Sequence, residues 1–304
     1  MDKLTIGLLT TDTDIVRDHD KDSGALLRGL AEAGFQTGAP VWHDPSVDWA
    51  AFDLLVVRSP WDYPERYAEF TGWLERAAGR TRILNAPDLI GWNIDKRYLD
   101  DFRARGIACV PYTFCTTPAE AATAIAGLAP GRIVVKPTVS AGSRDTGLFR
   151  PDDPRALDLA ERIIAGGKTA MIQPAAEHVI EHGENALFYF NGDYAYACHK
   201  GPILLPGGGY LGGEYTEHIT RADPSRAEIE LGGRAIAAIA DIAARKGFSE
   251  DAGRPLYARV DIAAHPGGAP EIIEVELFEP AYFVRIAPEA VTHFVEAVRK
   301  RCRQ

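Results

Sequence analysis

The sequence predicts a mixed fold, in which a parallel α/β region is followed by α+β structure. Three observations support this prediction. Short apolar stretches alternate with amphipathic ones over roughly the first hundred residues, as in a parallel sheet with helical crossovers. Later strand-like stretches are joined by Asn-Gly-Asp at 191–193 and by Pro-Gly-Gly-Ala at 266–269, and such turns favour antiparallel hairpins. The length of 304 residues suffices for more than one packed unit.

The elements expected in the first region follow from its apolar pattern. Buried strands are short continuous apolar runs, whereas helices repeat apolar residues every three or four positions. The expected strands span 4–10, 52–59 and 82–87, and the expected helices span 23–34 and 64–79, the second opened by Pro64. No G-x-G-x-x-G sequence follows the first strand, which argues against a dinucleotide site there.

The rest of the chain predicts a different arrangement. The stretch 93–106 predicts a helix with Asn93 and Lys96 on one face. A strand at 132–137 leads into a loop of small residues at 138–149. The later elements alternate between helices and strand pairs, namely helix 153–167, strand 170–174, a hairpin over 186–201, helix 224–246, a hairpin over 256–278 and a closing helix.

Composition limits the classes of function. Apolar residues make up 46% and charged residues 25%, as in an ordinary folded domain. The net charge of -10 argues against a broad nucleic-acid footprint, which needs a basic face, but it allows a local basic pocket for an anion. The chain shows no C-x-x-C pair, no signal-peptide pattern and no apolar run of membrane-spanning length. We therefore expect a cytoplasmic protein with reduced cysteines and no membrane partner.

An acidic strand near the end of the chain predicts a metal site. Alternate side chains of a strand share a face, so Glu274 and Glu276 are expected to point the same way. Asp261 lies across the predicted hairpin from them. Three converging acids repel one another unless a cation sits among them, and Mg²⁺ takes carboxylate and phosphate oxygens. The alternative is a solvated face with no ligand.

Basic residues elsewhere suit a polyphosphate. Lys136 ends an apolar strand, an unusual place for an exposed lysine, and Lys96 supplies a second candidate cation. The loop after Lys136 contains Ser140 and Ser143, and its N–H groups either wrap around phosphates or form a plain turn. Arg259 lies two residues before Asp261, so a guanidinium would share the face of the acids, where a transferring phosphoryl group needs one.

Taken in order, these features resemble the ATP-grasp ligases over nearly the whole chain. The matching features are a helix lysine, a strand lysine with a small-residue loop, the strand end "MIQPA" at 171–175, an R-x-D strand and an E-x-E strand. The resemblance implies an ATP-grasp fold. It implies an N-terminal α/β domain at 1–95, a small subdomain at 96–170 and a large subdomain at 171–304, with the nucleotide clasped between the last two.

The resemblance also implies roles for individual residues. Asp261, Glu274 and Glu276 would bind two Mg²⁺ ions, and Arg259 and Lys136 would act on the transferring phosphoryl group. Arg285, just past the metal strand, is expected to reach either that phosphate or the substrate carboxylate. The residues that would contact ATP are Lys96, Lys136, Ser140, Ser143, the backbone of Gln173, Pro174 and Ala175, and either Glu184 or Glu181 at the ribose. Many family members carry Asn where this chain has Glu276, and the usual N-x-x-P-G continuation is replaced by "ELFEPAYF".

Three further stretches resemble one branch of the family, the one that contains D-cycloserine synthetases. They are "RSPWDY" at 58–63, "SAGSRDT" at 140–146 and "EVELFEPAYF" at 274–283. The resemblance implies activation of a small amino-acid carboxylate as an acyl phosphate, and cyclisation of O-ureido-D-serine with release of CO₂ and ammonia. The alternatives are a peptide-type ligase that joins an amino acid to an amine, and a nucleotide-binding protein without activity.

Substrate contacts are expected at the carboxyl end of an early strand, where ligands of open α/β sheets gather. Arg58 and Ser59 lie there, and Lys200 ends a hairpin strand near the same cleft. A surface ion pair is the alternative for Arg58, and Trp61 and Tyr63 are expected to be packing residues. The glycine-rich segment 204–218 fits either a lid or the arm of a homodimer.

Overall fold

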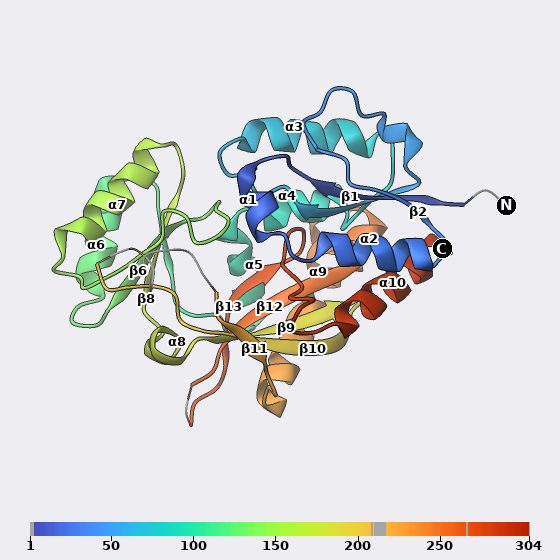
Figure 1. The fold of residues 1–304 in the computed structure, drawn as a ribbon. Helices are drawn as coiled ribbons and strands as arrows, with labels where there is room; N and C mark the ends of the chain where they lie inside the picture. Colours follow the sequence, from blue (N-terminus) through green and yellow to red (C-terminus); the bar gives the residue numbers. More distant parts are fainter. Residues whose placement is uncertain (1–2, 208, 210–216, 266, 304) are drawn as a thin grey trace.

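The computed structural model describes residues 3–207, 209, 217–265 and 267–303, in which three sheets are surrounded by helices (Figure 1). The first sheet is parallel, as predicted, with the order β2-β1-β3-β4. Its strands are β1 (Thr5–Thr10), β2 (Gln36–Gly38), β3 (Leu54–Ser59) and β4 (Ile83–Leu84). The sequence analysis missed β2, whose three residues are not buried and show no apolar pattern.

Helices cover both faces of this sheet. Figure 1 shows α3 (Tyr67–Ala78) on one side and α2 (Ser23–Glu32) on the other. The helix α3 buries Phe70 and Trp73, whereas α2 buries Leu26 and Leu30. The predicted start of α3 at Pro64 is three residues too early, because the preceding chain forms turns in which Arg66 N–H donates to Tyr63 O. Two shorter helices complete this region, α1 (Asp14–His19) and α4 (Pro87–Asn93).

The second sheet is antiparallel and stands apart from the first (Figure 1). Its order is β5-β8-β6-β7, with β5 (Thr113–Cys115), β6 (Ile133–Pro137), β7 (Gly147–Phe149) and β8 (Ala170–Pro174). The helices α6 (Pro118–Gly127) and α7 (Pro154–Ala165) pack on it through an apolar core. The strand β8 belongs to this sheet, so the sheet extends a few residues beyond the boundary at 170 that we predicted.

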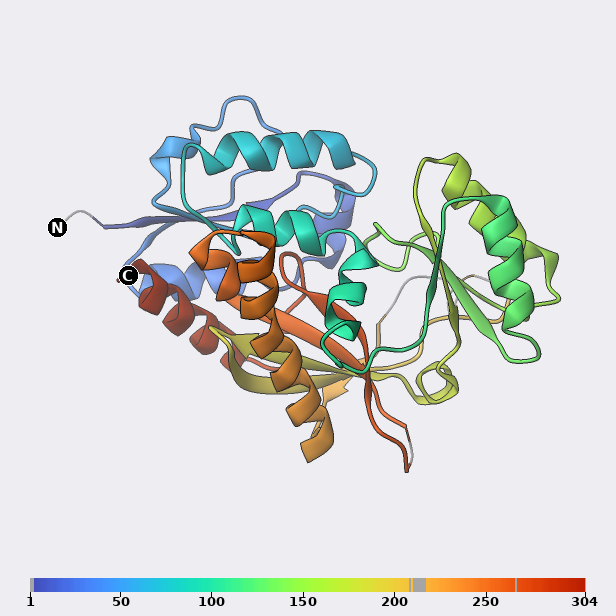
Figure 2. The same ribbon diagram turned by 180° about the vertical axis from the view of Figure 1, so that it is seen from behind.

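The third sheet contains both predicted hairpins. Its order is β11-β10-β9-β12-β13, with β9 (Glu184–Phe190), β10 (Asp193–Lys200), β11 (Ile219–Arg221), β12 (Tyr257–Ala263) and β13 (Glu271–Glu276). The long helix α9 (Arg226–Lys246) covers the face seen in Figure 2. The opposite face packs against α10 (Glu289–Cys302), which also contacts α2 of the first region. Two short helices, α8 (Glu177–His182) and η3 (Glu250–Gly253), precede β9 and β12 in the chain, and η3 packs against α9.

The helix predicted over 93–106 is broken, and this correction affects the site. The helix α4 ends at Asn93, and the chain continues as η2 (Lys96–Tyr98) and α5 (Leu99–Arg103). Between them Asp95 is extended, and its side chain accepts a hydrogen bond from Arg97 N–H at 3.0 Å. The Lys96 N–H donates instead to Thr138 O at 2.9 Å. The break therefore ties Lys96 to the loop that follows Lys136.

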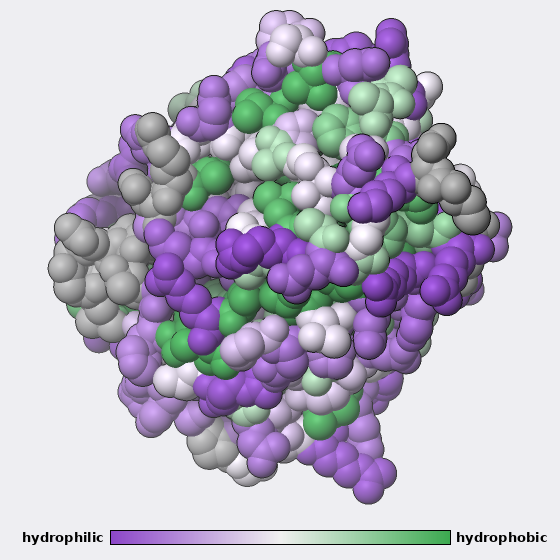
Figure 3. Space-filling model, turned by 45° about the vertical axis from the view of Figure 1, so that its right-hand side comes forward, coloured by the Kyte–Doolittle hydropathy of each residue, from purple (hydrophilic) through white to green (hydrophobic). Residues whose placement is uncertain are grey.

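The surface of the molecule is mixed. On the face shown in Figure 3, apolar side chains are interspersed with hydrophilic ones, as is ordinary for a surface in contact with water. In the part of the chain that the structure describes, none of the helices combines the length and the apolar character needed to cross a membrane.

Candidate active site

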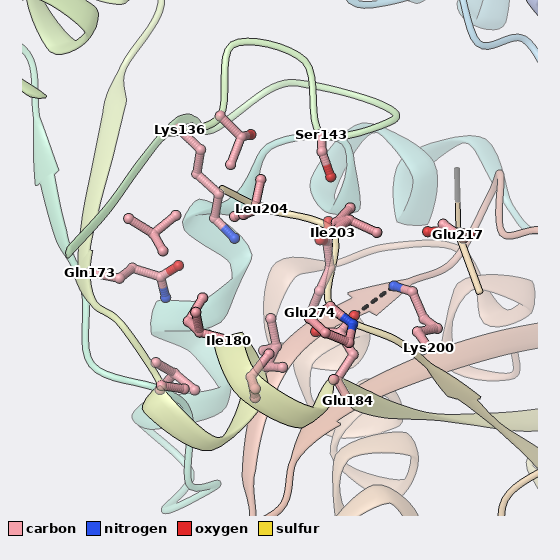
Figure 4. Close-up of a pocket in the computed structure, with 18 of the residues that line it drawn as sticks. Lys136, Ser143, Gln173, Ile180, Glu184, Lys200, Ile203, Leu204, Glu217 and Glu274 are labelled. Atoms are coloured by element: carbon pink, nitrogen blue, oxygen red, sulfur yellow. Dashed lines mark hydrogen bonds and ion pairs between the residues drawn. The ribbon is translucent and has the colours of Figure 1, made fainter. Parts of the chain in front are cut away.

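A cavity lies where the second and third sheets meet (Figure 4). The loop after β6 and the segment after β10 border it, and both sheets send charged side chains into it. The lining includes Lys96, Lys136, Ser140, Ser143, Gln173, Pro174, Glu184, Lys200, Arg259, Glu274, Glu276 and Glu279. The two early lysines and the late acidic strand, which the sequence analysis expected to share a site, therefore do so.

The acidic strand is buried. Strand β12 pairs with β13 so that Arg259 lies opposite Glu276 and Asp261 lies opposite Glu274. Side chains directly opposite on antiparallel strands are close neighbours on the same face. The side chain of Asp261 is only 2% exposed, and those of Glu274 and Glu276 are mostly covered. The alternative of a solvated acidic face is therefore wrong.

Basic side chains neutralise these acids. The guanidinium of Arg259 donates to both carboxylate oxygens of Asp261, at 2.8 and 2.9 Å, and also contacts Glu276. The amino group of Lys96 lies 3.0 Å from Glu274 Oε1. Buried charges are costly unless paired, so these ion pairs explain how so many acids are tolerated in one place.

Lys200 joins the buried Asp261 to a further acid, Glu184, which lines the cavity. Its amino group donates to Glu184 Oε1 at 2.6 Å (Figure 4) and, outside what that figure labels, to Asp261 Oδ2 at 2.9 Å. Burial disfavours the charged lysine, but Asp261 and Glu184 outweigh burial and raise the pKa of Lys200 well above its ordinary value. The sequence analysis placed Lys200 near the cleft, and the structure brings it between the predicted metal and ribose residues.

The pKa values show an excess of negative charge. Burial opposes ionisation of Asp261 and Glu274, but Arg259 acting on the first and Lys96 on the second hold both pKa values below their ordinary range. Burial raises the pKa of Glu276 to about 7 despite Arg259, and burial with Glu276 nearby raises that of Glu279 to about 8. Added positive charge would therefore stabilise this end of the cavity.

The donor atoms fit a hard divalent cation. Carboxylate oxygens are the protein ligands that Mg²⁺ prefers, and Asp261, Glu274 and Glu276 present them on adjacent strands. Among the described residues, however, no group of three or more acidic, histidine or cysteine side chains is arranged as a metal centre. Arg259, Lys96 and Lys200 hold the carboxylates instead. The metal-ligand set therefore stays a prediction.

Lys136 is the clearest sign of an anionic ligand. It lies near the end of β6, is 9% exposed, and points into the cavity (Figure 4). Burial, helped by the positive charges of Lys96 and Lys200, lowers its pKa despite Glu274. Within the described residues, its amino group makes no ion pair within 4.0 Å. A buried lysine that no carboxylate contacts directly suits a phosphate group.

The loop after β6 has the conformation expected of a small-residue segment. Gly142, Ser143 and Asp145 all have positive φ angles, of 60°, 53° and 51°. Ser140, Gly142 and Ser143 line the cavity. The loop therefore borders the cavity beside Lys136, although its contact with phosphates stays a prediction. The lid or dimer arm predicted for segment 204–218 also stays a prediction, because most of that segment lies outside the described residues.

The predicted adenine and ribose residues are partly in place. Gln173 and Pro174 line the cavity, whereas Ala175 does not, and the Ala175 N–H already donates to Arg132 O at 2.8 Å. Glu184 lines the cavity at the start of β9. The side chain of Glu181 is 61% exposed and faces Arg132. Of the two ribose candidates, the structure therefore brings only Glu184 to the cavity.

Four other predicted site residues do not line the cavity, namely Arg58, Ser59, Arg285 and the buried Asp261. Arg58 is 1% exposed, and its Nη1 donates to Pro280 O at 2.8 Å while its guanidinium stacks 3.9 Å from the ring centre of Tyr282. Ser59 donates to Asp20 Oδ2 at 2.8 Å. Arg285 is exposed in a turn. Arg58 joins the first region to the segment after β13, whereas Ser59 bonds within the first region. Neither a direct substrate contact nor a surface ion pair therefore describes Arg58.

The sequence analysis assigned no role to Glu279 and treated Tyr63 only as packing. Tyr63 is buried, and its hydroxyl lies 2.8 Å from Glu279 Oε1 and 3.1 Å from Ser140 O. Trp61 Nε1 donates to Glu279 O at 3.2 Å. The only sequence signal for this cluster is that its members belong to the three stretches typical of one family branch.

Comparisons with known proteins agree with this geometry. A family model described as the N-terminal domain of D-cycloserine synthetase DcsG matches residues 6–85. The cycloserine biosynthesis protein DcsG of Streptomyces lavendulae is 33% identical over 306 residues, which cover 97% of this chain and 99% of that protein. This likeness extends through the acidic strand and the cavity.

Solved structures show the same relationship. The crystal structure of D-cycloserine synthetase DcsG is 30% identical, with a TM-score of 0.84 over 98% of this chain and 99% of that one. A D-alanine–D-alanine ligase from Bacillus anthracis shares the fold, with a TM-score of 0.64 at 15% identity over 97% of this chain and 95% of that one. The chain has the ATP-grasp fold and belongs to the D-cycloserine synthetase family of ATP-grasp ligases.

Proposed function

We propose that this ligase uses ATP and Mg²⁺ to activate the carboxylate of a small amino acid, and that it cyclises O-ureido-D-serine to D-cycloserine. The observation that carries the proposal is the cavity in which the unpaired, buried Lys136 faces the acids of β12 and β13. The identity with the cycloserine biosynthesis protein supports the choice of substrate. The likeness to D-alanine–D-alanine ligase, at 15% identity, supports only the fold.

Different residues of the cavity would bind the phosphates, the adenine and the ribose of ATP. Lys136 and Lys96 would hold phosphate oxygens, the strand end at Gln173 and Pro174 would contact adenine, and Glu184 would accept hydrogen bonds from the ribose. Two Mg²⁺ ions held by Asp261, Glu274 and Glu276 would neutralise charge on the phosphates. Lys96 pairs with Glu274 and Lys200 pairs with Asp261 in this structure, so these ion pairs must open when ATP and Mg²⁺ bind.

The reaction follows from the charge arrangement. A carboxylate oxygen of the substrate attacks the γ-phosphorus of ATP, and ADP leaves, which gives an acyl phosphate with a good leaving group. Arg259 is buried at the acidic strand and would stabilise the negative charge that develops there. The substrate nitrogen bonded to oxygen then attacks the carbonyl carbon and expels phosphate, which closes the ring. Hydrolysis of the carbamoyl group releases CO₂ and ammonia.

Ring closure within one molecule gains from proximity, so the enzyme needs no second organic substrate. The test is phosphate release with ATP, Mg²⁺ and a panel of single amino acids, with the product identified by mass. We expect turnover with O-ureido-D-serine alone and less with its L-enantiomer. Turnover that appears only after a second amine is added would overturn the ring-forming reaction and identify a ligase that joins two molecules.

A further inference from the structure

The three sequence stretches typical of this family branch meet at Glu279. Tyr63 from the first stretch places its hydroxyl 2.8 Å from Glu279 Oε1, and Trp61 from the same stretch donates to Glu279 O at 3.2 Å. Ser140 from the second stretch has its carbonyl 3.1 Å from the same tyrosine hydroxyl. Glu279 itself belongs to the third stretch. Its backbone and its carboxylate are thus both fixed from the first region of the fold.

Glu279 differs from its acidic neighbours in that, within the described residues, it forms no direct ion pair. Glu279 lines the cavity, as do three of the four paired acids. The paired ones are Glu184 with Lys200, Asp261 with Lys200 and Arg259, Glu274 with Lys96, and Glu276 with Arg259. Within the described part of the chain, no lysine, arginine or histidine forms an ion pair with Glu279. Its partner, the hydroxyl of Tyr63, is neutral and buried.

We propose that Glu279 binds the α-ammonium of the substrate and thereby selects amino acids over otherwise identical acids without the amino group. This assignment rests on the proposed function, in which the substrate is an amino acid. The α-ammonium is attached one carbon from the reacting carboxylate, so it must lie close to the groups that handle the phosphoryl transfer. Glu279 follows Glu276 by three residues and borders the same cavity.

The surroundings suit an ammonium group. Ion pairs with an ammonium are strong when water is excluded and the carboxylate is held in place. Tyr63 orients the carboxyl group and has no charge of its own, so a cationic ligand meets no competing cation at this contact. Burial and the nearby Glu276 raise the pKa of Glu279 to about 8, as expected for a carboxylate that awaits a cation. A bound ammonium would return that pKa toward its ordinary range.

The test compares O-ureido-D-serine with its des-amino analogue, in which hydrogen replaces the α-ammonium. We expect the wild-type enzyme to favour the amino acid by ~100-fold or more in kcat/KM, because a fixed carboxylate is left unpaired by the analogue. In Glu279→Gln this preference should fall to within a few fold, while the KM for ATP stays unchanged. The control is Glu161→Gln, an exposed glutamate on α7, which should keep the wild-type preference.

Two results would overturn the assignment. One is a Glu279→Gln enzyme that still prefers the amino acid as strongly as the wild type. The other is a variant that needs a higher Mg²⁺ concentration for half-maximal rate while keeping its amine preference, which would make Glu279 a metal ligand. Tyr63→Phe, which removes the orienting hydroxyl and preserves the ring, should give an intermediate preference and keeps the test valid if Glu279→Gln folds poorly.

Failure of the proposed function is distinguishable from failure of this assignment. If the wild type turns over a different amino acid, the same comparison is run with that acid and its des-amino analogue. If it turns over none, calorimetric binding of O-ureido-D-serine and its analogue in the presence of ADP measures the preference without chemistry. Equal binding of the two compounds would overturn the role of Glu279, whereas binding of neither would overturn the proposed substrate and, with it, this assignment.

Discussion

The amino group of Lys200 lies 2.9 Å from Oδ2 of Asp261, the acid that we assign to Mg²⁺. In this structure, the amino group of Lys200 therefore occupies the position next to Asp261 where a Mg²⁺ ion is expected. We predict that Lys200→Met destabilises the nucleotide-free protein by ~3 kcal/mol, because a buried acid loses its partner. Added Mg²⁺ should restore more stability to this variant than to the wild type, as measured by thermal unfolding with and without the metal.

The matched control for Lys200→Met is Lys300→Met on the exposed end of α10. It should change neither the stability nor its dependence on Mg²⁺. A Lys200→Met protein that gains no more from Mg²⁺ than the wild type would show that Asp261 does not bind the metal.

Asp261 itself provides a second prediction. Asp261→Asn keeps the size of the side chain but removes a charge that two basic groups and the proposed metal share. We expect kcat to fall by ~1000-fold, because the phosphoryl-transfer charge is then poorly balanced. The measurement is phosphate release over a range of Mg²⁺ concentrations, with circular dichroism to confirm folding. Wild-type turnover in a folded variant would refute the metal assignment.

Lys136 gives a prediction in which stability and binding change in opposite directions. It is nearly buried and makes no ion pair in the described structure, so its charge is costly in the absence of a ligand. Lys136→Met should therefore leave the nucleotide-free protein at least as stable as the wild type. ATP affinity, measured by calorimetry, should fall by ~10- to 100-fold through loss of a charge-assisted contact. An unchanged ATP affinity would exclude Lys136 from the phosphate site.

Local patterns explain which parts of the fold the sequence predicted. The strands β1, β3 and β6 and the two hairpins are set by apolar runs and turn residues within the segment itself. The helix α6 was missed although Thr117 and Glu120 form a capping box around Pro118, which is a readable signal. The predicted boundary at 170 falls before β8, which pairs with β6 and so belongs to the second sheet. The local pattern of a strand does not show which strand it will pair with.

Contacts between distant segments explain what the sequence did not show. The helix predicted over 93–106 is interrupted after Asn93 because Lys96 N–H donates to Thr138 O, which lies 42 residues away in the sequence. Arg58 was expected at the substrate, but it is buried against Pro280 O, which lies 222 residues along the chain, and it does not line the cavity. Glu279 is adjacent to Tyr63 only in the folded protein. The charged residues of β12 and β13 were predictable because register within one hairpin positions them.

Asp22 provides a prediction about the segment after β13. Its carboxylate accepts hydrogen bonds from Tyr282 N–H at 2.6 Å and Val284 N–H at 2.9 Å, on either side of Phe283, whose φ is 54°. A left-handed conformation is unfavourable for phenylalanine and needs such support. We expect Asp22→Ala to destabilise the protein by ~2 kcal/mol and to raise the substrate KM, because Glu279 lies on this segment.

Asp158→Ala, an exposed change on α7, is the control for Asp22→Ala and should alter neither the stability nor the KM. Thermal unfolding and steady-state kinetics distinguish the two effects. A normal KM for the amino acid in Asp22→Ala would show that the segment keeps its position without this carboxylate.

The last prediction concerns the pH dependence of stability without ligands. Burial and Glu276 raise the pKa of Glu279 from 4.5 to about 8 in the folded protein. Between these values the folded state binds the proton more tightly than the unfolded state, so the free energy of unfolding decreases as the pH rises. Glu279→Gln lacks this titration. It should match the wild type near pH 5 and exceed it near pH 9 by on the order of 4 kcal/mol, in denaturant titrations without Mg²⁺ or ATP. Parallel pH profiles for the two proteins would show that Glu279 is ionised normally and already has a counter-charge.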